Sequence, residues 1–190
     1  MRTILFLALT VCPAAFAADP IAQLYDGQVS TVEREILGLA QAMPADKYDF
    51  APTNGTFTGV RTFGLQTRHV ATEIYALASA ILGEKPPVDT GATDNGPDSL
   101  KTKDQIVDYF KGALAFAHKA MNSLTQQNML DPVRGVPGGT RLGAAAFLTY
   151  HSYDHYGQMV VGQMVVYGRM NGVIPPSSQP RPAGAFKGKP

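Results

Sequence analysis

Apolar residues recur at spacings of three and four in four stretches of the chain, which is the pattern of amphipathic helices. The first stretch follows the helix-start pair Asp19-Pro20 and ends before Pro44, so it predicts a helix of about 24 residues. Its apolar positions are Ile21, Tyr25, Val29, Val32, Ile36, Leu39 and Met43. Nowhere do four or more residues alternate between apolar and polar side chains between turn signals, so the pattern predicts no strand.

Start and stop signals bound the other three stretches. The second helix should begin after Thr62 and stop at Gly83. The third should begin at a capping box formed by Thr102 and Gln105. The fourth is expected over residues 140–171. Four long amphipathic helices predict an all-α four-helix bundle.

Segments rich in Gly, Pro and Asp separate these helices. They cover residues 44–60, 83–101 and 131–139, and the long one at 83–101 is expected to be a mobile loop. Five prolines and a charge of +3 in residues 175–190 predict a disordered tail. We therefore expect the bundle to occupy residues 18–174.

The first 17 residues have the pattern of a secretory signal peptide. A basic residue near the start precedes an apolar run at 4–11, and Ala15 and Ala17 mark a small-x-small cleavage site. The run is shorter than the ~20 residues that span a bilayer. The alternatives are a buried N-terminal helix and a lipid anchor at Cys12, whose preceding residue fits that cleavage poorly. We expect cleavage after Ala17, export to the periplasm or beyond, and no stable membrane insertion afterwards.

Composition narrows the classes of function. The chain is 45% hydrophobic and 16% charged, which is sufficient for a core and excludes wholesale disorder. Sixteen Lys and Arg against fifteen Asp and Glu exclude a nucleic-acid binder that acts through a strongly basic surface. The single Cys excludes an internal disulfide and a zinc site built on cysteines.

The candidate chemistry lies in histidines. His151 and His155 are four residues apart on one face of the fourth helix, so both imidazoles can reach one metal ion. They continue the apolar stripe of that helix and should point into the bundle. His69 lies beside Val70 on the inward face of the second helix and supplies a third nitrogen. A three-His set leaves a coordination position open for water or substrate, which is the catalytic pattern.

Each of these residues also has a plainer interpretation. Two histidines at this spacing more often hydrogen-bond a neighbour or face solvent, and we interpret His118 as a surface or packing residue. Glu73 can be a fourth ligand, an orienting group, a general base or simply a hydrogen-bonded helix residue. Gln158 can orient water or bond a neighbouring helix. Three tyrosines in the same turns are expected to pack in the bundle: Tyr150, Tyr153 and Tyr156.

Several motifs with established chemistry are missing from the sequence. There is no Gly-rich phosphate loop, no Glu-x-x-His pair for a di-iron bundle, no Cys-x-x-Cys-His for covalent haem and no Gly-x-Ser-x-Gly. Nucleotide binding, carboxylate-bridged di-iron chemistry and α/β-hydrolase chemistry therefore have no support.

The segments RTFGLQTRHVATEIYALASAILGEKPP (61–87) and YHSYDHYGQMVVGQMVVYGRMNGVIPPSS (150–178) resemble the DinB/YfiT-like superfamily of metal-binding four-helix bundles. The turn at residues 48–52 resembles it too. The resemblance implies one divalent metal, usually zinc or nickel, held by His69, His151 and His155. Some relatives are thiol-dependent transferases or isomerases, and dimers occur among them. The family name implies no DNA contact.

One feature departs from that resemblance. Residues 157–161 and 162–166 form a direct repeat, GQMVV-GQMVV, where relatives carry the stretch once. Five extra residues advance a helix by ~500° and ~7.5 Å, so the downstream face is out of phase. We expect an overhanging fourth helix, or a break or π-bulge near Gly162.

Three functional hypotheses follow. The first is an exported metalloenzyme, by default a hydrolase and otherwise a transferase, acting on an unknown small molecule. The second is a non-catalytic metal-binding or structural bundle. The third, a haem b bundle using a His and a Met, is the least favoured. Three imidazoles alone suit zinc, nickel, copper or iron, and a homodimer is possible by analogy with relatives.

Overall fold

The first predicted helix is present in a computed structural model that describes residues 19–55, 57–156 and 163–180. It consists of α1 (Pro20–Val32), a π-helical segment η1 (Glu33–Leu37) and α2 (Gly38–Ala42) in one continuous run. The Asp19 side chain accepts a hydrogen bond from the Ile21 amide, as expected of its cap. The π turn was not predicted, and it places Glu35 on the buried side of the helix.

The next two helices match the predicted signals. In α3 (Phe63–Leu82), the Thr62 hydroxyl caps the start, and Gly83 ends the helix in the left-handed conformation at φ 69°. In α4 (Lys103–Asn122), both hydrogen bonds of the capping box between Thr102 and Gln105 are formed. The short 3-10 helix η2 (Ala45–Lys47) lies between the first helix and α3.

Two helices are described within the stretch 140–171 that was expected to be helical. They are α5 (Arg141–Tyr156) and α6 (Gln163–Met170), and α6 packs on α2 and α3. A Cβ on Gly168 would lie 2.9 Å from Leu39 Cδ1, so α6 sits close to α2. The six residues between the helices, including Gly162, lie outside the described residues. The interruption expected there stays a prediction.

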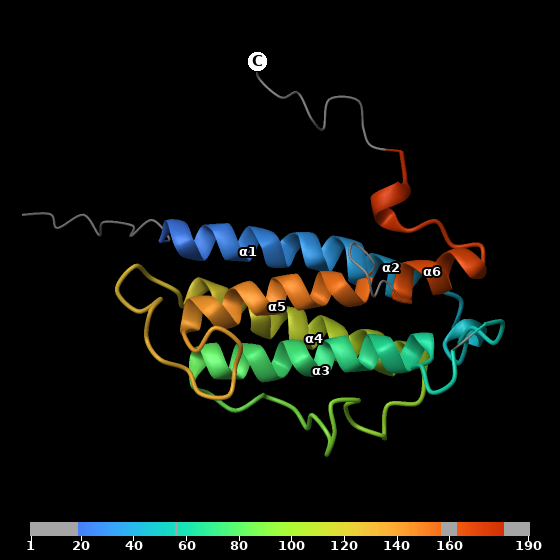
Figure 1. Cartoon of the computed structure of the whole chain (residues 1–190), viewed down its shortest axis with the longest axis horizontal. Helices are drawn as coiled ribbons and strands as arrows, with labels where there is room; N and C mark the ends of the chain where they lie inside the picture. The colour runs from blue at the N-terminus through green and yellow to red at the C-terminus, as the bar shows by residue number, and fades with distance from the viewer. Residues whose placement is uncertain (1–18, 56, 157–162, 181–190) are drawn as a thin grey trace, which may run out of the picture.

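The four long helices form a bundle (Figure 1), in which α1 and α3 each pack against both α4 and α5. Its core is continuous and includes residues from every long helix, among them Ile36, Ile74, Phe110 and Leu148. The chain is thus all-helical, and no strand occurs within residues 19–55, 57–156 and 163–180. The antiparallel contact between α3 and α5 positions the histidines.

The segment after α6 folds back onto the bundle. It contains the 3-10 helix η3 (Pro176–Ser178), which packs against η1. The Ser177 Oγ lies 3.0 Å from the Tyr156 hydroxyl, and Arg169 Nη2 donates to Ser178 Oγ at 2.6 Å. The disorder predicted from residue 175 is therefore not seen at Ser177 and Ser178, which make these contacts. The rest of the predicted tail and the predicted signal peptide at 1–17 lie outside the described residues.

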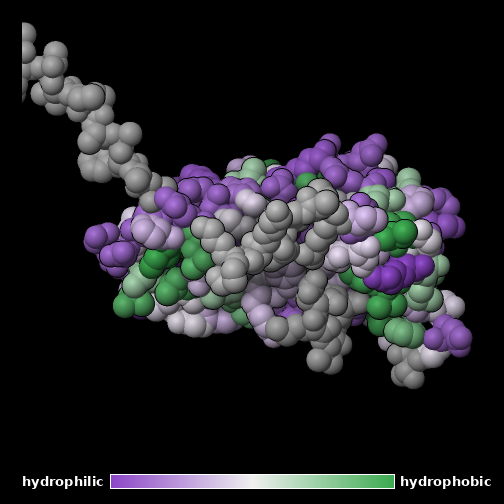
Figure 2. Space-filling view, turned by 90° about the horizontal axis from the view of Figure 1, so that it is seen from above, coloured by the Kyte–Doolittle hydropathy of each residue, from purple (hydrophilic) through white to green (hydrophobic). Residues whose placement is uncertain are grey.

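The surface is mixed rather than uniformly polar. Figure 2 shows hydrophobic side chains gathered towards both ends of the face seen from above. Among the described residues, the most exposed large apolar side chains are Leu130, Ile174, Leu24 and Met170. Within the part of the chain that the structure describes, no helix is long and apolar enough to cross a membrane.

Candidate metal site

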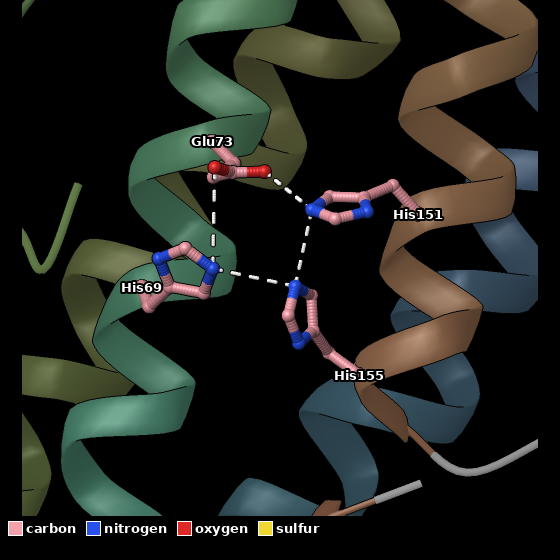
Figure 3. Close-up of side chains that lie close together, drawn as sticks. All are labelled: His69, Glu73, His151 and His155. Carbon is pink, nitrogen blue, oxygen red and sulfur yellow. Dashed lines mark hydrogen bonds and ion pairs between the residues drawn. The ribbon is translucent and has the colours of Figure 1, made fainter. Parts of the chain in front are cut away.

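Helices α3 and α5 bring the three predicted histidines together (Figure 3). The His69 Nε2 and His155 Nε2 atoms lie 3.3 Å apart, and His155 Nε2 and His151 Nε2 lie 3.1 Å apart. His69 and His155 are 4% and 9% exposed, and His151 is half-buried. The fourth histidine, His118, lies elsewhere.

The spacing of the three nitrogens fits a single metal ion. Zinc–imidazole bonds of about 2.0–2.1 Å in a tetrahedral arrangement separate neighbouring ligand nitrogens by about 3.3–3.4 Å. The observed separations of 3.1 and 3.3 Å are close to that value. Two of the three nitrogen pairs are therefore spaced as ligands of one ion would be, and all three nitrogens lie within 4.8 Å of one another.

Glu73 completes the cluster. It lies one turn after His69 on α3, with Oε2 2.6 Å from His151 Nε2 and Oε1 3.9 Å from His69 Nε2. The ligand atoms of His69, Glu73, His151 and His155 all lie within 4.8 Å of one another. Of the roles that the sequence left open for Glu73, this position is compatible with a fourth ligand and with a base beside the metal.

The electrostatics favour a bound cation. Burial, together with the neighbouring charges of His151 and His69, lowers the pKa of His155 to about 4. Burial also lowers the pKa of His69. The hydrogen bond from His151 lowers the pKa of Glu73. At neutral pH the two buried imidazoles are therefore neutral, with lone pairs available, beside an ionised carboxylate.

A main-chain group orients His69. Its Nδ1 lies 2.8 Å from the Asp94 carbonyl oxygen, in the segment between α3 and α4. A carbonyl can only accept, so Nδ1 carries the proton and Nε2 presents its lone pair to the cluster. Metal-ligating histidines commonly have such a partner. The sequence gives no indication of the Asp94 contact, because a backbone carbonyl in a loop has no residue-type signal.

A buried glutamine contacts the outer nitrogen of His155. Gln66 Nε2 lies 2.5 Å from His155 Nδ1, and Gln66 is fully buried. When this amide donates to Nδ1, the proton of His155 is on Nε2, which can donate to His69 Nε2. Metal binding through Nε2 moves that proton to Nδ1 and requires an acceptor there.

Gln66 can supply that acceptor. Its Oε1 is buried and makes no hydrogen bond with the described residues. If the carboxamide rotates by about 180°, Oε1 accepts a hydrogen bond from His155 Nδ1–H. Nε2 then takes the place in which Oε1 has no partner. Gln66 can thus offer either a donor or an acceptor to His155 Nδ1, and the acceptor is what a metal-bound His155 would need. A polar residue at a stripe position one turn before His69 was the signal that the sequence offered for this role.

The remaining candidates do not join the cluster. His118 bonds Asp26 through Nδ1 at 2.7 Å and Glu33 through Nε2 at 3.4 Å, so it links α4 to the first helix. Tyr156 is buried and donates to Glu35 Oε2 at 3.0 Å, in line with the expected packing role. Tyr150 is 48% exposed, and Gln158 lies outside the described residues.

A stacked aromatic ring borders the most exposed of the three clustered histidines. The Phe147 and His151 rings are nearly parallel, at 16°, with centroids 4.8 Å apart. Phe147 lies one turn before His151 on α5, so the stack fixes the plane of that imidazole from its own helix.

Comparison with known proteins gives the family of the chain. The family model of the DinB superfamily matches residues 28–159, and no curated protein matches the chain. The matched region spans more than half of the chain and contains all four residues of the cluster. The chain belongs to the DinB superfamily.

Proposed function

We propose that this protein binds one divalent metal ion, zinc or nickel, through His69, His151 and His155, and that it is a metal-dependent hydrolase or transferase. The observation that carries the proposal is the convergence of three Nε2 atoms on one point beside the Glu73 carboxylate. A three-His set leaves a coordination position for water or a substrate atom.

The residues of the cluster have separable tasks in this proposal. A bound divalent ion acts as a Lewis acid and lowers the pKa of a coordinated group. His69 and His155 present neutral nitrogens, since burial lowers the pKa of both side chains. Glu73 is ionised at neutral pH and can accept a proton from water or from a substrate hydroxyl or thiol.

Elemental analysis tests the metal site. The protein is purified without a histidine tag, and wild type is compared with His155→Ala and His118→Ala. We expect about one metal per chain in wild type and in His118→Ala, and loss of the metal in His155→Ala. His118 is the matched control, because it is a helical histidine with partners outside the cluster. If wild type holds no metal even after reconstitution, the cluster is a buried polar network and the enzyme proposal fails.

A non-catalytic metal-binding bundle is the second candidate. It is favoured by the short contact between Glu73 Oε2 and His151 Nε2, which places the carboxylate where it can fill the fourth position. Azide titration of the cobalt-loaded protein separates the two. A change in the visible spectrum on adding azide means an open position and supports the enzyme. No change in wild type, with a change in Glu73→Ala, means a position closed by Glu73.

We also propose that the protein is exported, with cleavage after Ala17, and that its partner is a small-molecule substrate rather than nucleic acid. The support is the signal-peptide pattern of residues 1–17 and the near-balanced charge. A homodimer is possible by analogy. N-terminal sequencing of the protein from the periplasmic fraction of an expressing bacterium tests export, and an intact N-terminus in the cytoplasm would contradict it.

A further inference from the structure

The segment that bears the Asp94 carbonyl is held against α3 by a buried arginine. Arg68 is 8% exposed and immediately precedes the ligand His69. Its guanidinium donates to the Asn95 carbonyl, to the Leu100 carbonyl at 3.3 Å and to Asp98 Oδ1 at 3.1 Å. One side chain therefore fixes three points of the connection between α3 and α4.

A second arginine holds the same segment from the start of α3. Arg61 Nε donates to Asn95 Oδ1 at 2.6 Å, and its Nη2 donates to Asp94 Oδ2 at 2.8 Å. The peptide that carries the Asp94 carbonyl is thus fixed on both sides, through the Asp94 side chain and through the Asn95 main chain. This is the carbonyl that accepts from His69 Nδ1 at 2.8 Å.

A glycine allows the segment to approach the helix. Gly96 has φ +75°, and a Cβ there would lie 2.5 Å from Thr72 Oγ1 and 3.0 Å from Arg68 Cγ. No other residue type fits between the segment and α3 without displacing one of them. The segment expected to be a mobile loop is therefore packed directly beside the ligand helix.

From these contacts we infer that Arg68 is a positioning residue of the metal site. With Arg61, it holds the Asp94 carbonyl against His69 Nδ1, so that the proton stays on Nδ1 and Nε2 remains bare for the metal. This inference rests on the proposed metal-binding function. It assigns a site role to a segment that contributes no ligand side chain.

Three variants and one control test it. Arg68→Met removes all three hydrogen bonds, Arg68→Lys keeps the charge but not the planar fork, and Gly96→Ala pushes the segment off α3. Gly135→Ala is the control, because Gly135 has the same φ of +75° with no atom within 4 Å of its would-be Cβ. Two quantities are measured on each folded variant: the zinc Kd by chelator competition, and the His69 tautomer in the metal-free protein by 15N NMR.

We expect the zinc Kd and the His69 tautomer to change in the same variants. Arg68→Met and Gly96→Ala should raise the zinc Kd by about 10- to 100-fold, as loss of outer partners of ligating histidines typically does. Arg68→Lys should be intermediate, and Gly135→Ala should match wild type. In wild type His69 should be protonated on Nδ1, and in the two strong variants the Nε2-protonated form should appear. If Arg68→Met does not fold, Gly96→Ala carries the test.

Two results would overturn the inference. One is an unchanged zinc Kd in both strong variants while wild type binds zinc. The other is an unchanged His69 tautomer in those variants, since Arg68 would then act on stability alone. A wild type that binds neither zinc nor nickel would instead overturn the proposed function, and the tautomer measurement on the metal-free protein would still decide whether Arg68 positions His69.

Discussion

At the scale of single residues, Gln66 gives the sharpest test of the site. Its Nε2 contacts His155 Nδ1, and its Oε1 has no hydrogen-bond partner among the described residues. Gln66→Glu puts an acceptor at His155 Nδ1 whichever way the group turns. Carboxylate–histidine–metal arrangements raise ligand basicity, so we expect tighter zinc binding, by about tenfold. Gln66→Leu should weaken binding by about the same factor. Chelator competition measures both.

Thr67→Val is the control for Gln66. Thr67 is also fully buried on α3, but its hydroxyl bonds the Phe63 carbonyl of its own helix. Its zinc Kd should equal that of wild type. A Gln66→Leu protein that binds zinc as tightly as this control would show that the carboxamide does not support His155.

The sequence predicted which histidines come together better than it predicted the groups that orient them. The spacing of His151 and His155, and the inward face that His69 shares with Val70, follow from helical periodicity alone. The role of Glu73 stayed open because periodicity gives a face and not a rotamer. The Asp94 carbonyl could not be predicted, since a main-chain acceptor depends on the path of a loop and not on residue type.

At the scale of elements, the π segment η1 places the side chain of Glu35 on the buried side of the first helix. Glu35 Oε2 accepts from the Tyr156 hydroxyl, and Glu35 Oε1 accepts from Arg34 Nε at 3.2 Å. Tyr156→Phe leaves this carboxylate short of a donor, so we expect a loss of about 1–3 kcal/mol in the free energy of unfolding. Urea denaturation measures it.

Tyr150→Phe is the matched control for the π segment. It makes the same chemical change on the same helix, at a side chain that is 48% exposed. We expect less than about 0.5 kcal/mol from it. Equal losses in the two variants would mean that the contact between η1 and α5 contributes nothing to stability.

Helix periodicity predicted three of the four long elements with their caps. It could not predict η1, since the apolar spacing from Val29 to Met43 fits an α-helix just as well. It placed α5 and α6 in one helical stretch with a break, a π-bulge or an overhang expected from the repeat, and the residues that would decide this, 157–162, lie outside the described ones. Periodicity identifies which residues face the core and is insensitive to a local change in hydrogen-bond register.

At the scale of the whole molecule, the buried histidines make stability depend on pH. The pKa of His155 is about 4 in the folded protein and about 6.5 when unfolded. Between those values the unfolded chain binds more protons, so the free energy of unfolding of the metal-free protein should fall as pH drops. The full span amounts to about 3 kcal/mol from this residue. The lowered pKa of Glu73 acts in the same direction at lower pH.

Urea denaturation of the metal-free protein at pH 7.5, 6 and 4.5 measures this dependence. His155→Gln should flatten it, because the variant removes the residue with the strongest shift while keeping a polar side chain. Equal stability of wild type at pH 7.5 and 4.5 would contradict the prediction. Zinc should oppose the loss near pH 6, since a bound metal stabilises the folded state by mass action.

The unequal support of the two buried histidines implies an order of events when the ion arrives. His69 already presents a bare nitrogen, because the Asp94 carbonyl holds its proton on the far side. His155 must first change tautomer, so that its proton is on Nδ1 and not on Nε2, and the Gln66 carboxamide must rotate so that Oε1 faces Nδ1. If an ion binds here, His69 would therefore be ready as a ligand before His155, which would need both its proton and the Gln66 amide to be rearranged.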